Sequence, residues 1–201
     1  MTQPEIRRRR TRTAKLVVTG AFDAGKTTLI GTVSDSTVLT TERRLTSAEA
    51  DGSSERTTVA MDFGRIGVEP DLALFLFGTP GQERFEFMWD ILAEGMLGFV
   101  LVVDASRPAT FEESARLRRR FTAAGDVPHV VAVNKAEPHT DTHELVGAVR
   151  AGLELPAEVP VVVADARVYD DAREVVLAFL RRVLDHHRRR THALTSAGGA
   201  G

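Results

Sequence analysis

The chain has 201 residues, which suits one domain with a complete apolar core, and its 26 basic and 28 acidic side chains give a net charge of −2. Cysteine is absent, which excludes disulfides, thiolate metal sites and cysteine nucleophiles and favours a reducing, cytoplasmic location. Because there is no long apolar run and no lipidation motif, we expect no membrane anchor, and peripheral contact with a membrane only through partner proteins.

Apolar, β-branched segments alternate with segments of helical periodicity along the chain. Strands are predicted at residues 14–19, 59–68, 72–77, 96–104, 129–134 and 159–164. Helices are predicted at residues 25–34, 83–94, 109–124, 142–153 and 171–187. The alternation indicates an α/β fold with a mostly parallel six-stranded sheet, one antiparallel edge strand and helices on both faces.

Both ends of the chain are expected to lie outside the folded domain, which we assign to residues 14–190. Residues 1–13 form an arginine-rich arm and residues 191–201 a small, polar tail, and both are predicted to be disordered. We interpret the basic ends as solvated segments and expect no nucleic-acid partner.

Two connections in the first half of the chain are distinctive. Residues 35–56 are polar, rich in Thr, Ser and Glu, and without a clear period, which predicts a long mobile loop with a functional role. Residues 67–71, in contrast, make a tight connection that contains a proline, which predicts an antiparallel hairpin.

The sequence GAFDAGKT at residues 20–27 is a complete GxxxxGK[ST] match between a predicted strand and a predicted helix. This pattern is typical of a phosphate-binding loop, in which glycines let backbone N–H groups wrap a polyphosphate. Lys26 then reaches the terminal phosphate oxygens, the Thr27 hydroxyl is a ligand of Mg²⁺, and the helix N-terminus favours the anion. The predicted nucleotide contacts in this segment are Gly20, Asp23, Ala24, Gly25, Lys26, Thr27 and Thr28.

Further motifs resemble those of Ras-like small GTPases, in the same order, over about residues 14–187. TVAMDF at 58–63 is similar to the switch I segment, and FGTPGQERF at 77–85 is similar to the switch II segment. The resemblance implies a P-loop G domain that binds GTP or GDP with Mg²⁺. It also implies that Thr58, or Thr57 as a fallback, closes on Mg²⁺ and the γ-phosphate. In switch II, the Gly81 N–H would contact the γ-phosphate, and Gln82 would orient the attacking water.

NKAE at 134–137 and DAR at 165–167 resemble the segments with which this family reads the guanine base. The resemblance implies base contacts from Asn134, Lys135, Glu137 and Ala166. The family has aspartate at the position of Glu137, whose carboxylate can still accept hydrogen bonds from the guanine N1–H and exocyclic amine. Guanine is therefore favoured, with weaker discrimination, and the alternative is a surface glutamate without a ligand role.

The switch II aspartate that supports Mg²⁺ in the family is Gly78 here. A hairpin that turns about Pro70 places Asp62 opposite Gly78, in a register that also pairs Val68 with Leu72. Asp62 can then extend over the glycine and replace the missing carboxylate, and bacterial polarity GTPases of the gliding-motility type show a similar exchange. The alternative is an ordinary polar strand residue, because a slip of one residue turns Asp62 to the other face.

Three further residues carry expectations of their own. Phe22 occupies a loop position at which Ras-like chains have a small residue, so its ring is expected to obstruct an activator's arginine finger and to slow hydrolysis. Arg56, two residues before Thr58, is either a cation that neutralises the charge of the transition state in cis or a solvated loop residue. Asp104, which ends a predicted strand, is expected to cap the following loop.

Within the Ras-like proteins, the two switch segments resemble actinobacterial conservon GTPases most closely. That resemblance implies three partners: a sensor-kinase-like membrane protein, a roadblock/LC7 protein and a small helix-turn-helix-like protein. An aromatic cluster after residue 82 either forms a docking face for such a partner or anchors the following helix to the core. The cluster consists of Phe85, Phe87, Met88 and Trp89.

Together the motifs predict a regulatory GTPase in a bacterial signalling complex. Mg²⁺-GTP would order the two switch segments, and hydrolysis would release them and change partner binding. The predicted catalytic residues are Gln82, Lys26 and Arg56, and the predicted metal ligands are Thr27, Thr58 and Asp62. The alternatives are a nucleotide-binding scaffold with negligible hydrolysis and an ATP-dependent enzyme, which Glu137 alone favours.

Overall fold

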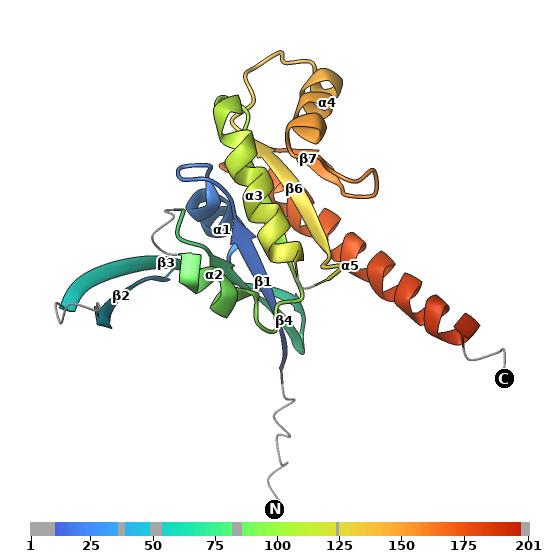
Figure 1. Ribbon diagram of the computed structural model, residues 1–201. Helices are drawn as coiled ribbons and strands as arrows, with labels where there is room; N and C mark the ends of the chain where they lie inside the picture. Colours follow the sequence, from blue (N-terminus) through green and yellow to red (C-terminus); the bar gives the residue numbers. More distant parts are fainter. Residues whose placement is uncertain (1–10, 36–38, 49–53, 82–85, 124, 198–201) are drawn as a thin grey trace, which may run out of the picture.

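The computed structural model describes residues 11–35, 39–48, 54–81, 86–123 and 125–197. Over these residues the chain forms a seven-stranded sheet in the order β2-β3-β4-β1-β5-β6-β7 (Figure 1). The strands are β1 (Arg12–Thr19), β2 (Leu39–Ala48), β3 (Ser54–Glu69), β4 (Leu72–Gly78), β5 (Gly98–Asp104), β6 (His129–Asn134) and β7 (Val161–Val163). The helices are α1 (Lys26–Val33), α2 (Glu86–Ala93), the 3₁₀ helix η2 (Pro108–Thr110), α3 (Phe111–Thr122), α4 (Thr142–Gly152) and α5 (Tyr169–Ala197).

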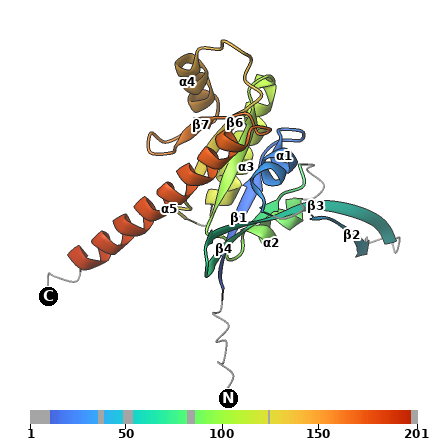
Figure 2. The same ribbon diagram turned by 180° about the vertical axis from the view of Figure 1, so that it is seen from behind.

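Helices cover both faces of the central sheet. In β1, Leu16 and Val18 are fully buried with residues of α1 and α5, whereas Val17 is fully buried with residues of α2, α3 and α4. Figures 1 and 2 show these two groups of helices on opposite sides of the strands. β4, β1, β5, β6 and β7 run parallel, and β3 pairs antiparallel with β4. The predicted α/β architecture, a mostly parallel sheet with helices on both faces, is therefore confirmed. The sheet gains one strand over the predicted six, β2, and with it a second antiparallel pairing.

The segment predicted as a long loop at residues 35–56 contains a strand instead. β2 pairs antiparallel with β3, from Leu39 opposite Phe63 to Ala48 opposite Ser54, and the hairpin extends away from the helices (Figure 1). The loop prediction was wrong for residues 39–48 and for residues 54–56, which belong to β3. Polar residues stand at successive positions in both segments, so no alternation of apolar and polar residues reveals the strands. Alternation marks a strand with one buried face, and a hairpin beyond the core does not need it.

β3 and β4 pair in the predicted register over most of their length. Residues 63–67 of β3 lie opposite residues 77–73 of β4, one to one. The same register continued by one residue sets Asp62 opposite Gly78, and a Cβ built on Gly78 would lie 3.0 Å from the Asp62 Cβ. The predicted juxtaposition of these two residues is therefore confirmed.

The register shifts by one residue at the turn of this hairpin. The predicted pairing of Val68 with Leu72 is wrong, because Glu69 pairs with Leu72 and Val68 is the extra residue of a bulge. The bulge lies next to the turn, so it does not alter the pairing near the other end of the two strands.

The two ends of the domain differ from their predicted boundaries. β1 begins at Arg12, so the predicted arm at residues 1–13 loses its last two residues to the sheet, and residues 1–10 lie outside the described part of the chain. α5 continues to Ala197, so most of the predicted tail at residues 191–201 is helical. The helix runs on because the first glycine after it is Gly198 and no proline intervenes.

The end of α5 projects beyond the sheet in both views (Figures 1 and 2). Among the described helices, none combines the length and the apolar composition needed to cross a membrane.

The aromatic cluster after residue 82 is divided between the core and the surface. Trp89 is only 4% exposed, and its Nε1 donates a hydrogen bond to the Pro80 carbonyl at 3.2 Å. Trp89 therefore anchors α2 to the core, which was one of the two predicted roles of the cluster. Phe87 and Ile91 lie one helical turn apart and are 52% and 64% exposed, which leaves an apolar strip on the surface of α2. Phe85 lies outside the described residues.

Candidate functional site

The GxxxxGK[ST] motif forms the turn between β1 and α1, at the carboxyl end of the sheet, where open α/β sheets bind their ligands. Its first and last glycines have no room for a side chain. A Cβ on Gly20 would lie 2.2 Å from the Val102 carbonyl oxygen, and a Cβ on Gly25 would lie 2.2 Å from Asn134 Nδ2. Gly25 also has a φ of 106° and is the N-cap of α1, so no side chain occupies the free N–H groups of the first helical turn.

Lys26 lies at the centre of this loop. Its side chain is buried, and Nζ donates hydrogen bonds to the carbonyls of Gly20 and Ala21 at 2.9 and 2.7 Å. Burial lowers the pKa of Lys26 to about 8, although nearby carboxylates, Asp62 first among them, act in the opposite direction. The segment after β4 approaches the same group, because a Cβ on Gly81 would lie 3.0 Å from Nζ.

Thr27 and Asp62 converge beside Lys26. The Thr27 hydroxyl donates a hydrogen bond of 2.5 Å to Asp62 Oδ2, and the absence of a side chain at Gly78 leaves the space that the carboxylate needs. Hydroxyl and carboxylate oxygens are the ligands that Mg²⁺ prefers in proteins. The described residues contain no group of three or more His, Cys, Asp or Glu suited to a metal ion. These two residues therefore suit a cation that takes its other ligands from phosphate and water.

The predicted base-reading segments meet the phosphate loop through Asn134. This side chain is buried at the end of β6, where its Nδ2 donates to the Ala24 carbonyl at 2.9 Å. Its Oδ1 accepts a hydrogen bond from the Ala166 N–H at 3.0 Å. One amide therefore joins β6, the phosphate loop and the segment before α5, so the structure brings together three motifs that are far apart in the sequence.

Glu137 lies in the turn that follows β6. Lys135 has a φ of 59°, which reverses the chain direction after the strand, and the Glu137 carbonyl accepts hydrogen bonds from the Thr140 N–H and hydroxyl at 3.2 and 2.9 Å. The turn therefore fixes the backbone of Glu137 and leaves its carboxylate exposed to solvent.

Asp165 and Arg167 form a bidentate ion pair in the neighbouring loop. Arg167 donates to both carboxylate oxygens, at 2.9 Å from Nε and 2.7 Å from the terminal nitrogen. These side-chain hydrogen bonds lower the pKa of Asp165 to about 2. The pair gives this loop a defined shape on the side of the site that Ala166 joins to Asn134.

Asp104 lies outside the phosphate loop and binds residues of two segments around it. It caps the loop after β5, as predicted, and it also binds two cations. Its Oδ1 accepts hydrogen bonds from the Ser106 N–H and hydroxyl at 3.0 and 2.6 Å, which is the predicted cap. Its Oδ2 accepts from Arg107 Nε at 2.9 Å and from Lys135 Nζ at 3.0 Å. Burial raises the pKa of Asp104, but the hydrogen bonds from these three residues outweigh it and lower the pKa to about 2.

Arg107 and Lys135 extend from Asp104 to the phosphate loop. The terminal nitrogen of Arg107 donates to the Phe22 carbonyl at 2.9 Å, and Lys135 Nζ donates to the Asp23 carbonyl at 2.6 Å. Sequence reasoning missed Arg107 because a charged residue in the loop after a strand belongs to no pattern that one sequence can display. Lys135 was predicted as a base contact, and the structure gives it this contact with the loop.

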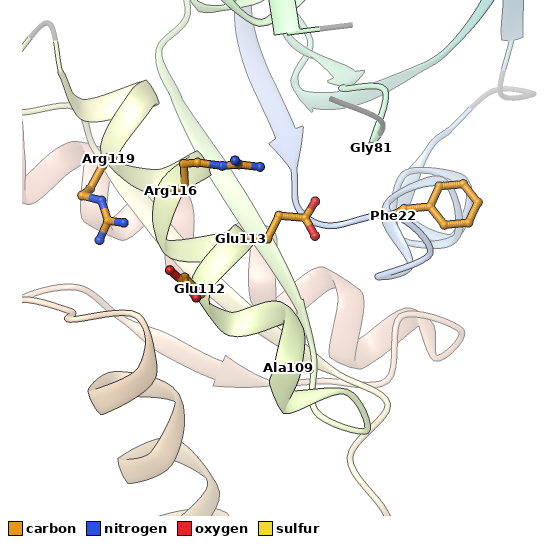
Figure 3. Close-up of a pocket in the computed structure, with 7 residues that line it drawn as sticks. All are labelled: Phe22, Gly81, Ala109, Glu112, Glu113, Arg116 and Arg119. Atoms are coloured by element: carbon orange, nitrogen blue, oxygen red, sulfur yellow. The ribbon is translucent and has the colours of Figure 1, made fainter. Parts of the chain in front are cut away.

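A cleft of about 650 Å³ opens beside the loop and Gly81 (Figure 3). Phe22, which is 61% exposed, lines one side of the cleft, and residues of η2 and α3 line the other. Figure 3 shows the Glu113 carboxylate pointing toward the loop and the Arg116 guanidinium extended toward Gly81. Because Gly81 also approaches Lys26, the cleft lies at the end of the loop that receives the terminal phosphate in P-loop proteins.

Three predicted site residues are not placed at this cluster by the described part of the chain. Gln82 lies outside the described residues. Arg56 and Thr58 belong to β3, where the structure describes their backbone, and Thr58 pairs with Arg44 of β2. Thr58 and Asp62 are four positions apart along β3, a distance of about 13 Å. The structure therefore brings Asp62 to the phosphate loop and leaves Thr58 on the projecting hairpin.

The glycine-bounded loop, its buried lysine and the facing Thr27 and Asp62 define a P-loop nucleotide-binding protein. The chain matches the family described as conserved hypothetical ATP binding protein over residues 38–186, and it belongs to that family. It is also 32% identical over 123 residues to an uncharacterized protein of Methanocaldococcus jannaschii. The aligned segment covers 61% of this chain and 70% of the relative. Nucleotide binding thus follows from both the site and the family, although the family match begins after the loop at residues 20–27.

The lowered pKa of Lys26 predicts a pH dependence of nucleotide affinity. Phosphate binds the protonated amine and raises its pKa, so binding takes up a proton once the pH exceeds about 8. We expect the Kd of a fluorescent nucleotide, measured by titration with Mg²⁺ between pH 6.5 and 9.5, to be flat below this value and to rise by up to about tenfold per pH unit above it. Lys26→Arg should lose the rise, because guanidinium stays protonated. A flat profile in the wild type up to pH 9.5 would contradict the role of Lys26.

Proposed function

We propose that this protein is a GTPase that binds GTP and GDP with Mg²⁺, hydrolyses GTP slowly and changes its interaction with partner proteins in step. The observation that carries the proposal is the junction at Asn134, whose amide joins the NKAE segment to the phosphate loop. With Asn134 and Lys135 held in this way, Glu137 follows on the side where a purine base would lie. Its carboxylate accepts hydrogen bonds from the N1–H and the exocyclic amine of guanine, whereas adenine presents a lone pair at N1.

Thr27 and Asp62 are the proposed metal ligands on the phosphate side of the site. They fit Mg²⁺ because two oxygen donors already lie 2.5 Å apart beside the loop. When bound, Mg²⁺ neutralises charge on the β- and γ-phosphates. Asp62 thereby takes the role of the carboxylate that Gly78 lacks. Thr58 completes this set in the proposal if the β2–β3 hairpin moves toward the loop.

The proposed hydrolysis needs little covalent chemistry from the protein. Lys26 holds the terminal phosphate oxygens, the Gly81 N–H donates to the γ-phosphate, and Gln82 orients the attacking water. Arg56 is the proposed cation that neutralises charge in cis. Phe22 is exposed at the mouth of the cleft next to Gly81, where its ring stands in the way of an arginine from another protein, and slow hydrolysis follows.

The proposed partners are a roadblock/LC7-type protein and a sensor-kinase-like membrane protein, through which the chain would reach the membrane periphery. The exposed side chains of Phe87 and Ile91 on α2 support such contacts, because an apolar strip on a surface helix is typical of a docking face. α2 begins shortly after Gly81, so loss of the γ-phosphate would change the position of the helix that carries this apolar strip.

Adenine nucleotides are the second candidate ligands, because the family is described as ATP-binding. Competition for the site decides between the bases. We expect GTP to displace a fluorescent GDP analogue at a concentration at least about tenfold lower than ATP does, because adenine loses one hydrogen bond to the charged carboxylate. Glu137→Ala should remove this preference, whereas Glu174→Ala, a surface control on α5 that pairs with Arg181, should keep it. Preferential displacement by ATP would overturn the guanine assignment.

An exchange of residues between the two strands tests the metal ligand. We expect Asp62→Ala to raise the Mg²⁺ concentration needed for half-maximal nucleotide binding by at least about tenfold. The double variant Asp62→Gly with Gly78→Asp should reverse part of this rise, because the carboxylate returns from the opposite strand into the space that Asp62 leaves. Magnesium titrations at fixed nucleotide measure both variants. An unchanged magnesium requirement in Asp62→Ala would show that this carboxylate does not hold the ion.

Single-turnover GTP hydrolysis tests the switch cycle. We expect slow release of phosphate by the protein alone, and faster release with a roadblock-type partner, because a partner can stabilise the water and the switch segments. Gln82→Ala should abolish hydrolysis, and Lys26→Ala should abolish binding. If no phosphate is released under either condition, the nucleotide-binding scaffold with negligible hydrolysis is the better description, and the exposed ring of Phe22 accounts for it.

A further inference from the structure

Two successive carbonyl groups of the phosphate loop are held by cations on the outer side of the loop. Arg107 donates to the Phe22 carbonyl and Lys135 donates to the Asp23 carbonyl, at 2.9 and 2.6 Å. Both cations are fixed by one carboxylate, that of Asp104, which is fully buried at the end of β5. The orientation of two peptide groups in the loop is therefore set by a single buried charge.

The orientation of these carbonyls determines where the N–H groups point. The described chain has no cis peptide, and in a trans peptide the N–H points opposite to the C=O. Because the Phe22 carbonyl turns outward to Arg107, the N–H of Asp23 turns to the inner side of the loop. The next peptide behaves alike, since the Ala24 N–H points across the loop to the Ala21 carbonyl at 3.2 Å. The inner side is where a P-loop receives phosphate.

The loop needs this support because its backbone is strained at one residue. Asp23 has a φ of 61°, in the left-handed region that is unfavourable for residues with a side chain. Its carboxylate accepts hydrogen bonds from Lys135 Nζ at 3.1 Å and from Arg107 at 3.3 Å, so the same two cations also hold its side chain. Release of either cation would let the loop relax and would turn N–H groups away from the phosphates.

We infer that Arg107 is a positioning residue for nucleotide phosphate, which keeps the Asp23 N–H directed into the loop and so slows nucleotide release. The inference rests on the proposed function only in taking the ligand to be a nucleoside di- or triphosphate. A planar guanidinium suits the task, because Nε binds Asp104 while the terminal nitrogen binds the Phe22 carbonyl. A lysine at position 107 would have to reach both oxygens from one nitrogen, as Lys135 does for Asp104 and Asp23, and would lack the fixed spacing of the guanidinium donors.

The rate of nucleotide dissociation tests the inference in the full-length protein. A fluorescent GDP analogue bound with Mg²⁺ is chased with excess GDP, and its release is followed by stopped flow. We expect Arg107→Ala to release it about tenfold faster, the effect of one lost charged hydrogen bond, and Arg107→Lys to lie between this variant and the wild type. Arg120→Ala is the matched control, because Arg120 pairs with Asp90 on α2 instead of the loop, and it should release at the wild-type rate.

A second readout separates positioning from a merely structural role. Loss of an N–H donor to phosphate should reduce the affinity for GDP more than the affinity for GMP. Arg107→Ala also removes a partner of the buried Asp104, so the unfolding midpoint of the nucleotide-free protein should fall, and the affinities are compared at a temperature at which the variant is fully folded. Equal losses of affinity for GDP and GMP, or a wild-type release rate in Arg107→Ala, would overturn the inference. The proposed function would stand in that case, as long as the wild-type protein binds the analogue. No binding of the analogue by the wild type would overturn both. If Arg107→Ala does not fold, Arg107→Lys decides by the same measurements.

Discussion

The site depends on one buried negative charge. A carboxylate without water is stable only when hydrogen bonds and opposite charges replace its hydration, and Asp104 obtains both from Ser106, Arg107 and Lys135. Its two cations come from different segments and each also binds the phosphate loop. Asp104 thus links the end of β5, the end of β6 and the phosphate loop, so the segment proposed to read the base is joined directly to the loop proposed to hold the phosphates.

Short-range patterns in the sequence predicted much of this arrangement. The spacing of the loop motif fixes two glycines where the structure leaves no room for a Cβ, so the strand, turn and helix around it could be read directly. The opposition of Asp62 and Gly78 followed from a turn position and the period of two in a strand. In both cases the geometry is set by residues close together in the sequence or by one hairpin, which is why sequence reasoning reached it.

Features that depend on distant contacts were not predictable in this way. β2 lacks alternation because it pairs along a projecting hairpin, and only its partner strand reveals it. Arg107 lies 84 residues from Asp23 in the chain, and nothing in its neighbours indicates that it reaches the loop. The extent of α5 was underestimated because its last turns extend past the sheet, where apolar periodicity no longer marks a helix.

The position of Asp62 on β3, opposite Gly78 of β4, has a mechanical consequence. β4 is hydrogen-bonded to a strand on each side, so a group at its end is held by the middle of the sheet. Asp62 instead belongs to the strand that continues outward with β2. Any force that a bound ion exerted on the Asp62 carboxylate would therefore act first on β3 and its hairpin with β2, at one edge of the sheet.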